Sequence, residues 1–195
     1  MRNLLIALVI LIVVFATIEY FSKNPVMPQQ SQTSQAQIGQ RSKTSGCQGN
    51  GALQDLQCTP GTVDASLTKD VLCSATFTTK SVRNVPSSEK QEVYSEYGIP
   101  SHQPGQYEVD HLVSLELGGS NDIANLWPEA AEPRPGFHEK DLVENYLHKQ
   151  VCAGSISLQD AQQKVATNWL QIFQSVPNIQ NYSYMNHQRR SRSNP

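Results

Sequence analysis

The 195-residue sequence lacks a Cys-x-x-Cys pair, an internal repeat and an excess of basic residues in its central part. Without a Cys-x-x-Cys pair, its four cysteines do not have the spacing of a structural zinc site. Residues 47–176 contain eight Lys or Arg against sixteen Asp or Glu, a net charge of −8, although the whole chain has −2. Because DNA binding relies on basic contacts with phosphate, this deficit argues against tight, sequence-selective binding.

Residues 22–46 have almost no large apolar side chains and are rich in Gln, Ser and Thr. Such a segment cannot bury enough surface to fold, so we expect a disordered linker. The tail, residues 177–195, is also expected to be disordered. Its three arginines, at 189, 190 and 192, would either capture nucleic acid or anionic lipid or only keep the tail soluble. One folded domain is therefore predicted at residues 47–176.

The first part of the chain is an uninterrupted apolar run at residues 4–18, preceded by Arg2 and followed by Glu19. Its fifteen residues fall short of the roughly twenty that span a bilayer, but snorkelling of Glu19 would let the next two aromatic residues complete the span. Residues 1–21 are predicted to be an uncleaved signal anchor, with a cleaved signal peptide as the alternative. The preceding positive charge predicts an exported protein, either anchored in the inner membrane or secreted, at the periplasmic or extracellular face.

The segment at residues 107–128 is the most informative part of the chain. Apolar and polar residues alternate from Tyr107, which predicts a strand, and a strand places Asp110 and His111 on opposite faces unless it ends or twists there. Residues 118–122, Gly-Gly-Ser-Asn-Asp, are a dense turn signal. The sequence therefore predicts a broad hairpin in which the residues from Asn125 return beside the first strand.

Three prolines, at 128, 133 and 135, are expected to end the second strand. From His138 the apolar residues recur at three- and four-residue steps, which predicts a helix. Ser157 and Asp160 are expected to open a second helix, whose apolar stripe, including Trp169, would belong to the core.

These residues resemble the HNH, or ββα-metal, endonuclease family, and most of all its secreted bacterial branch. The branch has the motifs Asp-His-Leu-(Ile/Val)-x-Leu-Glu-Leu-Gly-Gly and Asn-Leu-Trp-Pro-Glu, which match residues 110–119 and 125–129. Similarity to the branch extends from Cys58 to Trp169. The resemblance implies an α+β fold in which flanking helices surround a ββα-metal core. From the cysteines and the apolar run at residues 4–18, we expect this fold to be stapled by disulfides and preceded by an N-terminal hydrophobic helix.

The resemblance also implies roles for individual residues. Asp110 and His138 would hold one divalent metal ion, Mg²⁺ or Mn²⁺, and His111 would be the general base. Asn125 would orient that base and brace the hairpin. Because the stretch before His138 is long and rich in proline, His148 is an alternative metal ligand.

Three basic residues are further candidates for binding the substrate. Arg83 and Lys90 match basic positions of the secreted branch and would contact phosphate, with an ordinary surface charge as the alternative. Lys140 would either stabilise the developing charge or face water. No small-molecule cofactor is expected.

The four cysteines Cys47, Cys58, Cys73 and Cys152 allow three pairings. In an oxidising compartment they should form two disulfides, each worth about 2 to 4 kcal/mol. We expect Cys47 to pair with Cys58 in a short loop, and Cys73 to tie an early segment to Cys152 at the end of the helix that follows His138. Free buried thiols are the alternative if the chain is not exported.

The expected function is a metal-dependent endonuclease that hydrolyses phosphodiester bonds of DNA outside the cytoplasm, with RNA as a second candidate substrate. Nucleic-acid binding would be weak, non-specific and sensitive to salt. The membrane would be a partner only through an uncleaved N-terminal helix. Two alternatives are a catalytically inactive HNH-fold binding module and a membrane-anchored envelope protein.

Overall fold

The computed structural model describes residues 38–177, 179 and 180. Strands β1 (Tyr107–His111) and β2 (Leu126–Ala130) pair in antiparallel fashion, which confirms the predicted hairpin. The connection between them contains two short 3₁₀ helices, η1 (Leu115–Leu117) and η2 (Ile123–Asn125). The described part of the chain is thus an α+β fold built on a two-stranded sheet.

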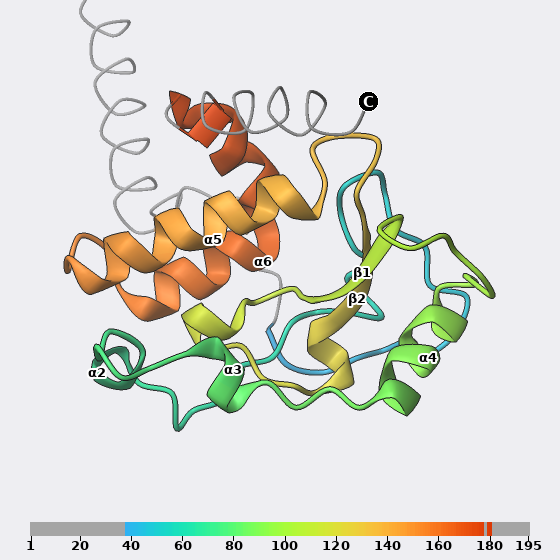
Figure 1. Ribbon diagram of the computed structural model, residues 1–195, viewed down its shortest axis with the longest axis horizontal. Helices are drawn as coiled ribbons and strands as arrows, with labels where there is room; N and C mark the ends of the chain where they lie inside the picture. Colours follow the sequence, from blue (N-terminus) through green and yellow to red (C-terminus); the bar gives the residue numbers. More distant parts are fainter. Residues whose placement is uncertain (1–37, 178, 181–195) are drawn as a thin grey trace, which may run out of the picture. The chain divides into compact units, whose positions relative to one another are not determined.

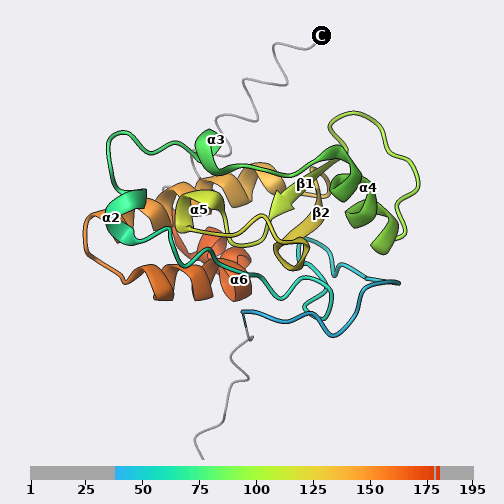
Figure 2. The ribbon, with the colours of Figure 1, turned by 90° about the horizontal axis from the view of Figure 1, so that it is seen from below.

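The hairpin lies between one helix on one side and two helices on the other (Figures 1 and 2). On one face, Val109 and Leu126 pack with Val93 of α4 (Ser87–Glu96). On the other, Trp127 joins the larger core formed with α5 (Phe137–Cys152) and α6 (Leu158–Ser175). Because side chains alternate along a strand, this arrangement fixes which hairpin residues face α5 and which face α4.

Local sequence explains why α5 and α6 begin where they do. At the start of α5, the carboxylate of Glu139 accepts a hydrogen bond from the backbone N–H of Gly136 at 2.9 Å. At the start of α6, Ser157 Oγ accepts one from the N–H of Asp160 at 3.0 Å, as predicted. These contacts satisfy backbone donors that have no partner inside a helix. Of the predicted apolar stripe of α6, Ala161, Val165, Ala166 and Trp169 are buried, and Leu170 and Phe173 are partly buried against the same core.

Both disulfides form with the expected pairing. Cys47 is bonded to Cys58, and Cys73 is bonded to Cys152 across 79 residues of sequence. Cys73 directly follows the short helix α2 (Lys69–Leu72), whereas Cys152 is the last residue of α5. The second disulfide therefore attaches the α2 segment, which precedes α3 (Thr79–Val82), to the end of α5.

Described residues on both sides of the predicted domain, residues 47–176, contact it. Before Cys47, the backbone N–H groups of Ser42 and Lys43 donate to the carbonyl of Gln57 at 3.0 and 3.1 Å. After residue 176, Ile179 is buried in the larger core. Hydrogen bonds and one apolar contact thus hold residues whose composition predicts a linker and a tail.

The predicted signal anchor at residues 1–21, residues 22–37 of the linker and residues 181–195 of the tail lie outside the described residues. Within the described ranges, no helix combines the length and the apolar character that a membrane crossing requires.

The expectation that Pro128 ends the second strand is wrong. Pro128 lies in the middle of β2, opposite Val109. A two-stranded sheet has an outer edge on both strands, where the N–H that proline lacks needs no partner. Pro133 and Pro135 do follow the end of β2, which is at Ala130.

Candidate active site

At the end of the hairpin, the side chains of Asp110 and His111 point to opposite faces of the strand and have different surroundings. Asp110 lies opposite Trp127 and contacts α5, whereas His111 lies opposite Leu126 and contacts the connection between the strands. Both side chains are buried, with 9% and 1% of their surface exposed. Strand alternation therefore persists to the end of β1 and separates the two neighbours.

On the α5 side, Asp110 belongs to a buried ionic cluster centred on Lys140. The Lys140 ammonium donates to Asp110 Oδ2 at 2.6 Å and to the backbone carbonyl of His111 at 2.8 Å. It also donates to Glu144, one turn further along α5, and lies 3.9 Å from Glu129 of β2. Lys140 has 0% of its surface exposed, although the sequence left open whether it faces water.

The charges in this cluster depend on burial and on the single ammonium. Burial alone would raise the pKa of Asp110, but the charge and hydrogen bond of Lys140 outweigh it and hold that pKa below its usual value. Burial opposes the charge of Lys140 too, but the facing carboxylates keep its pKa well above the usual range. Asp110 and Lys140 therefore form an ion pair.

Glu129 and Glu144 behave differently from Asp110, because one ammonium cannot neutralise three carboxylates. Burial raises the pKa of both glutamates well above the usual value. Among the described residues, ionised Glu129 has no hydrogen-bond donor within reach, whereas its protonated form can donate to Asp110. The neutral acid is thus the form of Glu129 that the surroundings favour.

On the opposite side, Asn121 orients the ring of His111. The His111 Nε2–H donates to Asn121 Oδ1 at 3.2 Å, which leaves the lone pair on Nδ1, an atom with no hydrogen-bond partner among the described residues. Asn121 Nδ2 donates to the carbonyl of Val82 at 2.8 Å, and its Oδ1 also accepts from the N–H of Asn84 at 2.9 Å. Asn121 therefore connects the base candidate to the segment after α3.

His111 is neutral at ordinary pH. Burial lowers its pKa to about 4, and the positive charges of Arg83 and Lys140 act in the same direction, against the raising effects of Asp110 and Asn121. A neutral imidazole with a lone pair on Nδ1 can accept a proton from water. The site thus contains one group suited to general-base chemistry.

Asn125 has the bracing role that the resemblance implies. Its Oδ1 accepts from the N–H of Val113 at 2.9 Å, and its Nδ2 donates to the carbonyls of Val113 and Ser120 at 3.0 and 2.8 Å. The turn is so tight that a Cβ on Gly119 would lie 1.7 Å from the Val113 carbonyl oxygen. The hydrogen bond that orients the ring of His111 comes instead from Asn121, whose place in the sequence indicates only a turn.

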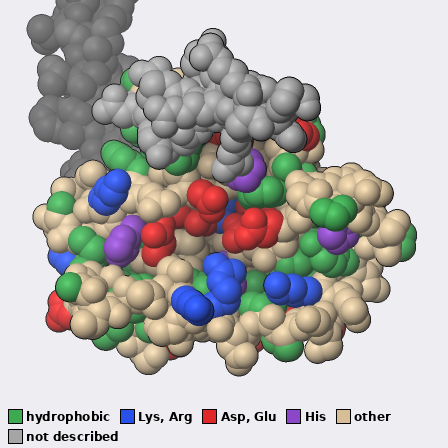
Figure 3. Space-filling model, in the orientation of Figure 1, with side chains coloured by type: hydrophobic (Ala, Val, Ile, Leu, Met, Phe, Trp, Pro, Cys, Tyr) green, Lys and Arg blue, Asp and Glu red, His purple; other side chains and the backbone are tan. Residues whose placement is uncertain are grey.

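The basic candidates Arg83 and Lys90 are both exposed, at the end of α3 and on α4. The charge of Arg83 influences the pKa values of both His111 and Glu108, so it lies close to the end of the hairpin. In Figure 3, acidic side chains gather over α5 and the hairpin, and basic side chains lie beside them on the side of α3. Arg83 itself lies between Val82 and Asn84, the two residues whose backbone groups bond Asn121.

The predicted metal ligand His138 is half-buried in the first turn of α5, with its ring centroid 4.2 Å from that of Phe137. Two residues along a helix correspond to a rotation of about 200°. His138 therefore leaves α5 on nearly the opposite side from Lys140, the residue that contacts Asp110.

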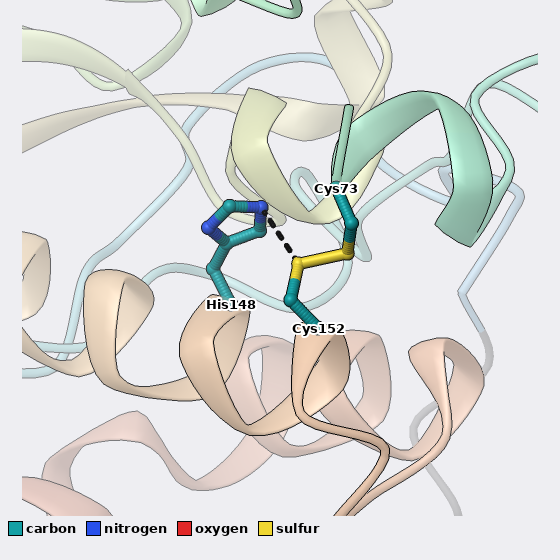
Figure 4. A group of neighbouring side chains, drawn as sticks. All are labelled: Cys73, His148 and Cys152. Carbon is teal, nitrogen blue, oxygen red and sulfur yellow. Dashed lines mark hydrogen bonds between the residues drawn. A yellow bond between two sulfur atoms is a disulfide. The ribbon is translucent and has the colours of Figure 1, made fainter. Parts of the chain in front are cut away.

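The alternative ligand His148 is two turns beyond Lys140 on α5. Its Nε2 lies 3.2 Å from the Leu72 carbonyl oxygen and 3.4 Å from Cys152 Sγ (Figure 4). Cys73, His148 and Cys152 are the one group of three metal-type ligands within 4.8 Å of one another in the described ranges. Both sulfurs belong to the disulfide, so this group offers no thiolates.

A divalent metal held by Asp110 and His138 does not fit these contacts. Lys140 already neutralises the Asp110 carboxylate, and helix periodicity directs His138 elsewhere. In residues 38–177 and 179–180, no three carboxylate or imidazole ligand atoms that include Asp110 lie within 4.8 Å of one another. The metal role of this pair stays a prediction from the resemblance.

Searches against protein-family models, curated proteins and solved structures found no match to this chain.

Proposed function

We propose that this protein is an exported endonuclease that hydrolyses phosphodiester bonds of DNA, with RNA as a second candidate substrate. The observation that carries the proposal is the neutral His111, whose ring is oriented by Asn121 and whose Nδ1 keeps its lone pair. The order strand, strand, helix in β1, β2 and α5 is also the order of a ββα-metal core.

In the proposed reaction, His111 Nδ1 accepts a proton from the attacking water. The water oxygen forms a bond to phosphorus, the bond to the leaving oxygen breaks, and that oxygen takes up a proton from solvent. Arg83 binds the phosphate and offsets its charge. Because His111 is 1% exposed, water and substrate reach Nδ1 only when the residues that cover the ring move.

Two further features support this proposal. The two disulfides are typical of proteins outside the cytoplasm. The net charge of −8 at residues 47–176 predicts weak, non-specific binding that falls steeply with added salt. Contact with a membrane would come from residues 1–21 alone.

The test is plasmid cleavage by the full-length chain with its disulfides formed, followed on agarose gels with and without Mg²⁺ or Mn²⁺. The variant His111→Ala should lose about 10²- to 10⁴-fold in rate because the base is gone. His102→Ala is the matched control, because His102 stacks on Tyr94 with ring centroids 4.4 Å apart and lies outside the site. Equal rates for His111→Ala and wild type would refute the assignment of the base.

A binding module without catalysis is the second candidate. The nearly complete burial of His111 favours it, because a base that water cannot reach performs no hydrolysis. In that case the wild-type chain would bind DNA, and no divalent ion or pH would produce cleavage.

A further inference from the structure

Lys140 uses all its hydrogen-bonding capacity inside the protein. An ammonium group has three N–H donors, and here they go to Asp110 Oδ2, the His111 carbonyl and Glu144. With 0% exposure, Lys140 contacts neither solvent nor a surface-bound substrate. It is therefore a fixed internal cation that joins the end of β1 to α5.

The position of this cation matters because Asp110 is the carboxylate that the resemblance assigns to a metal. Two cations beside one buried carboxylate would repel each other strongly in a medium of low polarity. To admit a metal ion, Lys140 would have to leave its three acceptors and place its charge elsewhere in the interior. The additional oxygen ligands that a metal would need, on Glu129 and Glu144, already face the ammonium.

We propose that the Lys140 ammonium takes the place of a divalent metal at Asp110, and that the reaction at His111 proceeds without one. The inference rests on the proposed function where it concerns catalysis. Lys140 acts as a positioning residue: it fixes the carbonyl of His111, and Asn121 fixes the ring of the same residue. The site is thus ordered from two sides without an ion.

The inference predicts that removing the ammonium exposes a metal site. In Lys140→Ala, the oxygens of Asp110, Glu129 and Glu144 would face a cavity of the right polarity for a hard cation. This variant should gain one Mn²⁺ per chain, and the double variant Lys140→Ala/Asp110→Asn should lose it again. A purely structural lysine predicts no such gain. The matched control is Lys164→Ala on α6, whose lysine is exposed.

The first measurement is independent of activity and uses Mn²⁺ as the probe. Titration of the full-length wild-type chain is followed by electron paramagnetic resonance and by paramagnetic broadening of the His111 ring signals in NMR. No broadening is expected at Mn²⁺ concentrations up to about 1 mM, well beyond the range of a specific site. Selective broadening of His111 below that concentration would overturn the inference, even if Lys140→Ala does not fold.

The second measurement is plasmid cleavage before and after treatment with a chelator. The rate should change less than twofold. A loss of tenfold or more that Mg²⁺ or Mn²⁺ restores would overturn the inference but leave the endonuclease proposal in place. If the wild type never cleaves, the endonuclease proposal fails, and the Mn²⁺ titration still decides whether Lys140 replaces a metal.

Discussion

The two faces of the hairpin end differ in how completely their polar groups are paired. On the α5 side, the Lys140 ammonium has three acceptors and no exposed surface. On the α3 side, His111 Nδ1 has no hydrogen-bond partner in the described part of the chain, and the nearby Arg83 is exposed. Adjacent residues of one strand thus differ in pairing: Asp110 is held in an ion pair, whereas His111 has a ring nitrogen with no partner in the described part of the chain.

The largest expected effect comes from removing the ammonium of Lys140 from the ionic cluster on the α5 side. Lys140→Ala should lower the free energy of unfolding by about 3 to 5 kcal/mol, because it leaves the buried Asp110 carboxylate without its cation. Urea unfolding followed by circular dichroism measures this change. Lys164→Ala should stay within about 0.5 kcal/mol of wild type. Equal stability of the two variants would show that the cluster does not hold the hairpin to α5.

A smaller effect should separate the two asparagines of the connection. Asn125→Ala should cost about 1 to 3 kcal/mol of stability, because it leaves buried backbone groups of Val113 without partners. Asn121→Ala should change stability less but lower the cleavage rate about 10- to 100-fold, because the ring of His111 is no longer oriented. Parallel unfolding and cleavage assays test this division, and a reversed pattern would contradict it.

The smallest expected effect is on the pH dependence of cleavage, which the protonation of His111 should set. The folded pKa of His111 is about 4, against a usual value of 6.5. The base is active when unprotonated, so cleavage should persist as pH falls and disappear only near pH 4. Burial is the main cause, and Arg83 adds to it, so Arg83→Gln should move this acid limb to higher pH. An acid limb near pH 6.5 in the wild type would contradict the burial of the base.

The same pKa has a consequence for stability. Below pH 6.5 the unfolded chain binds a proton on this histidine that the folded chain refuses until about pH 4. The contribution of His111 to stability is therefore complete above pH 6.5 and decreases as pH falls toward 4. A His111→Gln variant should lack this part of the pH dependence in urea unfolding.

Much of the framework follows from the sequence because it rests on local rules. Alternation before a glycine-rich turn predicts the hairpin, and three- and four-residue apolar steps predict α5 and α6. The pairing of Cys73 with Cys152 was also expected, although four cysteines allow three arrangements. Composition alone does not indicate that Ile179, in the predicted tail, is buried in the larger core, because this contact joins residues far apart in the chain.

The site was decided by contacts between residues far apart in the chain. The sequence by itself determined that Asp110 and His111 stand at the end of a strand beside a tight turn. Only the tertiary structure decided that Lys140, thirty residues later, neutralises Asp110, and that Asn121 rather than Asn125 orients the ring of His111. The physical reason is burial. A buried carboxylate is stable as an ion only beside a cation, and a buried imidazole N–H needs a hydrogen-bond acceptor.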